Sequence, residues 1–157
     1  MCTMTGQKWE SLLFPIIIDS GVCASVVPSG WCRHVPIQKT QQSEAYEYFW
    51  AANGSTIYNE GQKSVSMMTR EGTWRDMRFT VCDVSKALGS VSQMCRAGHT
   101  VVFNPPWHEE GSYIEYLDTG ERMWLEEING FCVLNIKVAP KEWQITLSQG
   151  FARQESP

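Results

Sequence analysis

The triplet Asp19-Ser20-Gly21 places a carboxylate, a hydroxyl and a glycine directly after an apolar run over residues 12–18. Asp19 is the only charged residue between positions 11 and 31. Burying an ionisable group in such a stretch is costly unless the group is hydrogen-bonded or partnered, so an isolated charge there is more often functional than incidental. The pattern predicts a buried strand that ends at a reactive carboxylate.

Carboxylates can hydrolyse a peptide bond without a nucleophilic side chain. One carboxylate deprotonates water while a carboxylic acid polarises the carbonyl, and two such groups within hydrogen-bonding distance share one proton because both cannot ionise together. Asp19 supplies one of them. The second triplet of this kind, Asp118-Thr119-Gly120, precedes the charged pair Glu121-Arg122, which favours a solvated hairpin turn.

Composition limits the class of protein. A chain of 157 residues fits one domain with its own core. The formal net charge of -4, without a run of Lys or Arg, argues against a nucleic-acid partner. Residues 1–10 include Lys8 and Glu10 and lack the apolar core of a signal peptide, and no apolar stretch approaches the roughly 18 residues of a membrane span. We therefore expect an intracellular, cytoplasmic protein with no membrane partner.

The cysteines form no Cys-x-x-Cys pair and no zinc-ligand spacing. We expect reduced, mostly buried thiols, with no metal and no cofactor. Cys32 and His34 share a face of an extended segment, and Cys95 and His99 are close to a helical turn apart, but neither pair has a third partner. A thiol peptidase or a metal site is therefore the less favoured alternative. The six cysteines are Cys2, Cys23, Cys32, Cys82, Cys95 and Cys132.

Turns containing Gly, Pro or Asn recur at short intervals, and the stretches between them are rich in Val, Ile, Thr and aromatic residues. This punctuation predicts an all-β protein, folded as a closed barrel of short antiparallel strands. One short helix is expected over about Val91 to Ala97, because Ser90 and Gln93 form a capping box and Gly98 supplies a stop. The strands are expected over residues 14–18, 45–51, 55–59, 63–69, 73–82, 100–103, 112–117, 122–127 and 131–138.

The order of these parts resembles a retropepsin, the aspartic protease of retroelements. The parts that carry the resemblance are Asp19-Ser20-Gly21, the glycine-bearing hairpin over Ala51–Ile57, the long hairpin ending in Phe79-Thr80-Val81, and Ala87-Leu88-Gly89 before the helix. The segment from Ala87 to Phe103 looks especially like the one that follows the protease flap in copia-type retrotransposon polyproteins. The resemblance covers residues 16–103, and the hairpins through Asn129-Gly130 to Val138 are similar to those polyproteins less specifically.

The resemblance implies an aspartic endopeptidase that processes a retroelement polyprotein. The catalytic residue is then Asp19, and its partner carboxylate comes from Asp19 of a second copy across a two-fold axis. Ser20 is expected to hydrogen-bond across that axis, and Gly21 is expected to give the turn dihedral freedom and to leave room for the substrate backbone. The expected partners are a second copy of this chain and a polypeptide substrate.

The same resemblance assigns the other parts of the site. Val22 completes the active-site loop, and Leu88 and Gly89 support it. The flap is expected at Ala52, Asn53, Gly54 and Ser55, where a hairpin closes over a peptide bound as an added strand. The retropepsin-like domain is expected to span residues 14–140, between an N-terminal extension over 1–13 and a C-terminal tail over 141–157.

Two departures and one compositional feature leave alternatives open. Retropepsins usually have alanine after the catalytic glycine, where this chain has Val22, and Ala87 is smaller than the usual branched residue. A catalytically inactive domain of the same fold, which dimerises or binds peptides, is therefore the alternative function. The seven tryptophans could also line a sugar or peptide groove, but their irregular spacing favours core and interface packing.

Overall fold

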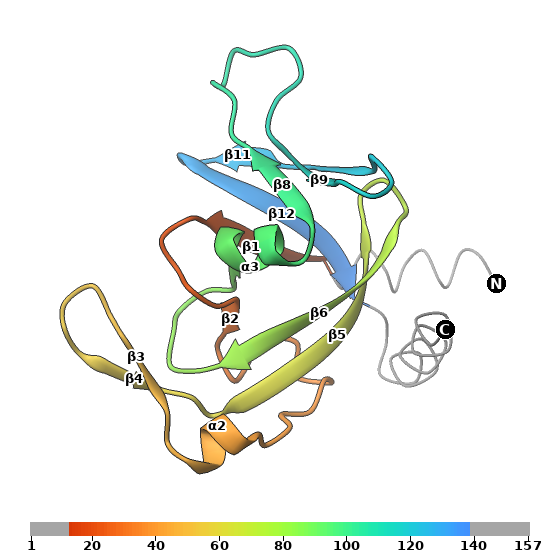
Figure 1. The fold of residues 1–157 in the computed structure, drawn as a ribbon. Helices are drawn as coiled ribbons and strands as arrows, with labels where there is room; N and C mark the ends of the chain where they lie inside the picture. The colour runs from red at the N-terminus through yellow and green to blue at the C-terminus, as the bar shows by residue number, and fades with distance from the viewer. Residues whose placement is uncertain (1–12, 139–157) are drawn as a thin grey trace.

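The computed structural model describes residues 13–138 (Figure 1). Strands are the main regular structure in this part of the chain, and its two helices are short. The helices are α2 (Gln41–Glu44) and α3 (Val91–Arg96). The strands are β1 (Leu13–Asp19), β2 (Val26–Val27), β3 (Tyr48–Trp50), β4 (Thr56–Tyr58), β5 (Gly61–Thr69), β6 (Trp74–Val81), β7 (Leu88–Ser90), β8 (His99–Val102), β9 (Tyr113–Tyr116), β10 (Arg122–Trp124), β11 (Glu126–Ile128) and β12 (Phe131–Val138).

The main sheet has seven strands in the order β1-β7-β2-β6-β5-β12-β11, and β1 also pairs with β12. This second pairing brings the sheet back onto itself as a ring. The pairs β1–β7 and β2–β6 are parallel, so the predicted antiparallel arrangement holds for the other strand pairs but not for these two. Parallel neighbours need long connections, and here those connections contain the β3–β4 hairpin and the β5–β6 hairpin. A separate three-stranded sheet has the order β10-β9-β8.

The core lies inside this ring. Alternate residues of β1 point inward, so that Ile16 and Ile18 are buried against the buried face of β12, which includes Leu134 and Ile136. Lys63 is the one charged side chain that is buried among the described residues. Its Nζ donates to backbone carbonyl groups of the segment that follows β2, including that of Ser29 at 3.0 Å.

Helix α3 begins where the capping residue was predicted. The Ser90 side chain accepts a hydrogen bond from Gln93 N at 3.2 Å, and the helix ends at Arg96 before Gly98, whose φ is 89°. The reciprocal half of the predicted capping box is absent, because Gln93 Oε1 instead accepts from Ser25 N at 2.8 Å. The glutamine therefore joins the helix to a segment that lies far away in the sequence.

Three other predictions of secondary structure differ from the structure. The strand expected over residues 45–51 begins only at Tyr48, because α2 and a residue with positive φ, Tyr46, precede it. The strand expected over 122–127 is two strands, because the chain changes partner from β9 to β12 at the buried Leu125. The short strands β2 and β7 and the helix α2 were not predicted.

The predicted extension and tail lie outside the described residues, apart from Leu13 in β1. Over residues 13–138, no helix is both long enough and apolar enough to cross a membrane.

Candidate active site

Asp19 is the last residue of β1 and lies at the start of the loop that joins β1 to β2. The parallel pairing of β1 with β7 places Asp19 opposite Ser90 and Ile18 opposite Gly89. The Asp19 side chain is half-buried, and its Oδ1 accepts a hydrogen bond from Gly21 N at 2.7 Å. The carboxylate is therefore fixed by its own loop while remaining accessible.

Gly21 leaves room for this close approach. A Cβ at this position would lie 3.2 Å from Asp19 Oδ1, which is tighter than ordinary van der Waals contact. Gly21 is not among the described glycines with positive φ, so the predicted need for a special dihedral is wrong. Ser20 and Gly21 are both exposed, and the side chain of Val22 is half-buried.

The loop after Asp19 is held by residues that the sequence analysis did not assign to the site. Ser90 N donates to Ser25 Oγ at 2.9 Å, and Ser90 Oγ donates to Val22 O at 2.8 Å. Ser25 N donates to Gln93 Oε1 at 2.8 Å. Ser25 and Ser90 are buried, so these bonds are shielded from water. The start of α3 thus positions both ends of the Val22–Ser25 segment.

Leu88 and Gly89 pair with the end of β1, beside Asp19. Leu88 pairs with Ile17 on one side and with Val26 on the other, which joins the strands before and after the loop. Gly89 is buried, and a Cβ there would lie 2.9 Å from Met94 Cε and 3.1 Å from Ile18 Cδ1. A side chain at position 89 would therefore disturb the packing under Asp19.

Asp19 borders two hollows on the surface. One, of about 440 Å³, is also lined by Lys86, Leu88 and Phe131. The other, of about 240 Å³, is lined by Ser20, Phe103 and Phe131 as well as Asp19. The phenylalanines are exposed, Phe103 by 48% and Phe131 by 49%. The surface around the carboxylate therefore mixes polar and apolar groups, with two phenylalanine rings and the Lys86 cation in its walls.

The residues predicted as the flap form the tip of the β3–β4 hairpin. Gly54 has a φ of 85°, its N–H donates to Ala51 O at 2.9 Å, and Asn53 Oδ1 accepts from Ser55 N at 2.9 Å. Ala52 and its neighbours at the tip are exposed. The hairpin projects from the side of the molecule on which the β1–β2 loop lies (Figure 1). The predicted flap therefore forms a separate two-stranded sheet and does not pair with the strands around Asp19.

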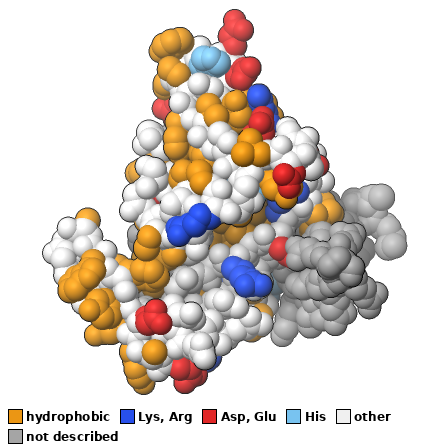
Figure 2. All heavy atoms as spheres, viewed as in Figure 1, with side chains coloured by type: hydrophobic (Ala, Val, Ile, Leu, Met, Phe, Trp, Pro, Cys, Tyr) orange, Lys and Arg blue, Asp and Glu red, His pale blue; other side chains and the backbone are white. Residues whose placement is uncertain are grey.

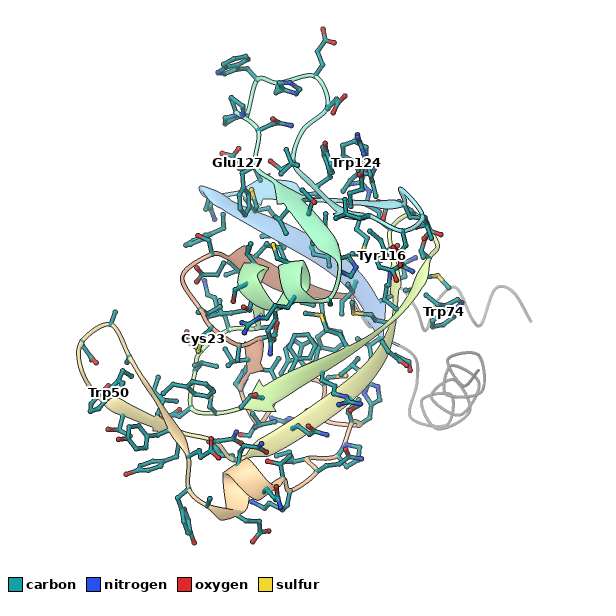
Figure 3. The ribbon with its side chains drawn as sticks, in the orientation of Figure 1. Cys23, Trp50, Trp74, Tyr116, Trp124 and Glu127 are labelled. Atoms are coloured by element: carbon teal, nitrogen blue, oxygen red, sulfur yellow. The ribbon has the colours of Figure 1, made fainter. Side chains whose placement is uncertain are left out.

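One face of this hairpin is aromatic. The Tyr48 ring lies 5.4 Å from the Trp50 ring and 6.0 Å from the Tyr58 ring, measured between centroids. All three side chains are more than half exposed, and Figure 3 shows Trp50 on this hairpin. Their mutual contacts stiffen the two strands and leave a wide aromatic surface for contact with another polypeptide.

Asp118 does not approach this site. It lies in the exposed turn between β9 and β10, where its Oδ2 accepts a hydrogen bond from Tyr116 Oη at 3.1 Å. Asp118 is therefore a turn residue, and among the described residues Asp19 alone has the expected setting at the end of a core strand.

The buried thiols Cys32 and Cys82 are poor nucleophiles. Cys32 Sγ lies 3.6 Å from His34 Nε2, but burial raises the pKa of the Cys32 thiol to about 12, so it stays protonated. Burial likewise raises the pKa of Cys82 to about 11. The expectation of mostly buried thiols is wrong for Cys23 and Cys95, which are exposed. Over residues 13–138, no group of three or more His, Cys, Asp or Glu side chains could hold a metal ion.

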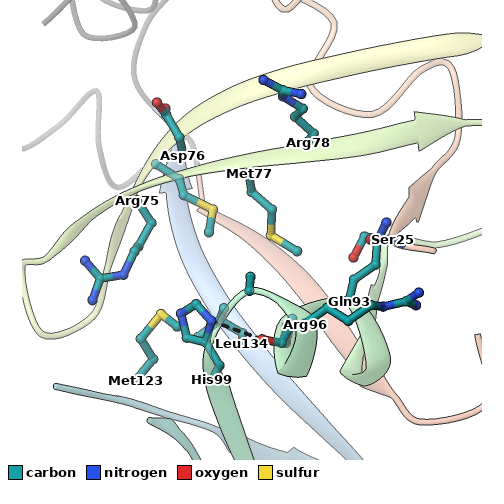
Figure 4. A pocket seen from close by; sticks show the side chains of 13 residues that line it. Ser25, Arg75, Asp76, Met77, Arg78, Gln93, Arg96, His99, Met123 and Leu134 are labelled. Carbon is teal, nitrogen blue, oxygen red and sulfur yellow. Dashed lines mark hydrogen bonds between the residues drawn. The ribbon is translucent and has the colours of Figure 1, made fainter. Parts of the chain in front are cut away.

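A further cavity, of about 450 Å³, lies between α3 and β6, and Asp19 is not among its lining residues (Figure 4). Its walls include Met67, Met77 and Met123, and His99 lies at one side. His99 Nδ1 is 3.2 Å from Met94 O, and burial lowers the pKa of this imidazole, which is therefore neutral near pH 7. The cavity contains no pair of facing carboxylates, so it does not suit the acid–base chemistry predicted here.

The described tryptophans do not share a groove. Trp31 packs between Phe14 and Phe79 in the core, Trp50 lies on the hairpin, and Trp124 packs against Tyr113 (Figure 3). Trp31 and Trp124 thus pack against other rings, whereas Trp50 and Trp107 are exposed on separate parts of the surface.

Comparisons with protein-family models, curated proteins and solved structures find no match to this chain. The site is therefore defined by its own geometry. Asp19, Ser20, Gly21 and Val22 lie together above Leu88 and Gly89, and the hairpin tip lies apart from them.

Proposed function

We propose that this chain is a retropepsin-like aspartic endopeptidase that acts as a homodimer on polypeptides, in the processing of a retroelement polyprotein. The observation that carries the proposal is the setting of Asp19. A single half-buried carboxylate ends a core strand, accepts a hydrogen bond from Gly21 N at 2.7 Å and borders two surface hollows.

The need for a second copy follows from the chemistry. Water activation between carboxylates requires one ionised and one protonated group, and each chain supplies one Asp19 in this setting. A two-fold axis next to Asp19 would bring two identical loops together. The exposed phenylalanines Phe103 and Phe131 beside Asp19 supply apolar surface for such an interface.

The substrate class follows from the hairpin. The tip over Ala52–Ser55 is exposed and is joined to the body through β3 and β4 alone, so it is free to close over an extended peptide. Ser25, Ser90 and Gln93 meanwhile hold the Asp19 loop rigid. A carboxylate held in a rigid loop, together with a hairpin that can close over it, suits cleavage of a polypeptide bound as an added strand.

A peptide-library digest at mildly acidic pH tests the proposal. Wild-type protein should cleave, Asp19→Asn should not, and the matched variant Asp118→Asn should cleave like wild type, because Asp118 lies in an exposed turn. Chelators should have no effect. Activity that survives Asp19→Asn, or that is lost on thiol alkylation and flat from acid to alkaline pH, would refute the aspartic mechanism.

Val22 favours a second candidate, a catalytically inactive domain of the same fold that dimerises or binds peptides. Its side chain adds volume beside the catalytic loop, where retropepsins usually have alanine. A wild-type chain that dimerises but cleaves no peptide in the same digest would select this candidate.

A further inference from the structure

The loop between β8 and β9, over residues 103–112, has an exposed apolar tip. Trp107 is 81% exposed, and Phe103 at the start of the loop is 48% exposed. The loop projects past β11 at one end of the molecule, where hydrophobic, histidine and acidic side chains gather (Figures 1 and 2). Tryptophan is the side chain that most often anchors a protein interface, so this exposure suggests a contact.

The loop is held in shape at its base. Asn104 Nδ2 donates to Gly111 O at 2.7 Å, and Asn104 N donates to Ser112 Oγ at 2.9 Å. Nearer the tip, His108 N donates to Pro105 O at 2.9 Å. Because these bonds fix the backbone in advance, a partner that covers Trp107 would have to order little of the loop.

The base of this loop adjoins the surface around Asp19. Phe103 begins the loop and lines the same hollow as Asp19 and Phe131. Ile128, just before the β11–β12 turn, is 43% exposed. Exposed apolar side chains therefore extend from the carboxylate to the base of the loop that carries Trp107.

We propose that Trp107 anchors the homodimer by packing against a second copy of this chain, beside the place where the two Asp19 loops meet. The inference rests on the proposed function, because that function requires a second copy at Asp19. In a two-fold interface each anchor is used twice. Two such loops, one from each copy, would therefore stabilise the dimer outside its catalytic centre.

The charges near the tip are compatible with a second copy. Glu110 Oε2 lies 3.4 Å from Arg122 Nη1, so its charge is partly neutralised within the chain. Glu109 has no such ion pair among the described residues. Lys86 lines the Asp19 hollow, so the surface that a second copy offers carries a cation as well as apolar side chains.

Sedimentation velocity over a dilution series of the full chain tests the inference. Trp107→Ser should raise the dimer dissociation constant at least about thirtyfold, the effect of losing an interface anchor, and Trp107→Phe should raise it less. The matched control is Leu117→Ser, because Leu117 is 60% exposed and lies just beyond the opposite end of β9. It should leave the constant unchanged. Equal urea midpoints for the variants would show that the fold is intact.

The outcomes separate the two proposals. A dimer that is unaffected by Trp107→Ser overturns the anchor and leaves the peptidase standing. A dimer that depends on Trp107 but cleaves no peptide supports the anchor and refutes the peptidase. A chain that stays monomeric at every concentration overturns both.

Discussion

Replacing Gly89 with alanine tests the packing beneath the Asp19 loop. A Cβ at this position would lie 2.9 Å from Met94 Cε, 3.1 Å from Ile18 Cδ1 and 3.2 Å from Ile16 Cγ2. Carbon atoms pack best at about 3.5–4.0 Å, so all three neighbours must move by several tenths of an ångström. Met94 is flexible and can yield, whereas Ile16 and Ile18 are buried in the central strand β1.

The expected loss of stability combines two effects. Overfilling a packed position typically costs about 1–3 kcal/mol. Replacing glycine also restricts the unfolded chain, which returns about 0.4–1 kcal/mol where the native backbone suits alanine, and Gly89 does not have a positive φ. The free energy of unfolding should therefore fall by about 1–2 kcal/mol.

Urea unfolding followed by tryptophan fluorescence measures this change. Gly30→Ala is the matched control, because nothing lies within 4 Å of a Cβ there and its φ is not positive. That variant should be as stable as wild type or slightly more so. If Gly89→Ala proves as stable as Gly30→Ala, the close packing of β7 against β1 is wrong.

Three further predictions concern buried groups. Lys63→Met should lower the free energy of unfolding, measured by urea titration, by about 2–5 kcal/mol, because buried carbonyl groups then lose their hydrogen-bond donor. An unchanged free energy of unfolding would contradict the buried position of Nζ. Iodoacetamide should alkylate the exposed Cys23 in the native protein but Cys32 only after unfolding, because burial raises the pKa of Cys32 to about 12. Peptide mapping of the native protein that finds Cys23 and Cys32 equally labelled would contradict this prediction. Burial lowers the pKa of His99 from its ordinary 6.5, so the unfolded chain takes up the proton first, and stability should fall as pH drops below 6.5. If the urea midpoint of His99→Gln falls with decreasing pH as much as that of wild type, His99 is not the cause of the loss of stability.

Local pattern was enough to predict the strands that carry the site. β1 is an apolar run that ends at a charge, and β12 alternates between buried and half-buried residues, so both appear in the sequence. β2 and β7 are only two and three residues long, and their pairing with β6 and with β1 fixes them. Such short strands depend on tertiary partners that local propensity does not contain.

The same limit applies to the site. The position of Asp19 at a strand end was predictable because charge and hydrophobicity change there. The roles of Ser25 and Gln93 were not, because they meet through a hydrogen bond between segments that are 68 residues apart. Gln93 was expected to complete its own helix cap, but its side chain instead accepts a hydrogen bond from Ser25 in the segment that follows Asp19.

The most direct test of the central claim is a mixing experiment with wild-type and Asp19→Asn chains. If each active site needs one Asp19 from each of two copies, a ninefold excess of the variant at fixed total concentration should lower the activity per wild-type chain to about one tenth, because most wild-type chains then pair with an inactive one. Dilution of wild-type protein through its dimer dissociation constant should likewise lower specific activity. Activity per wild-type chain that stays constant in both titrations, while light scattering reports a monomer, would contradict the account and require a second catalytic group within one chain.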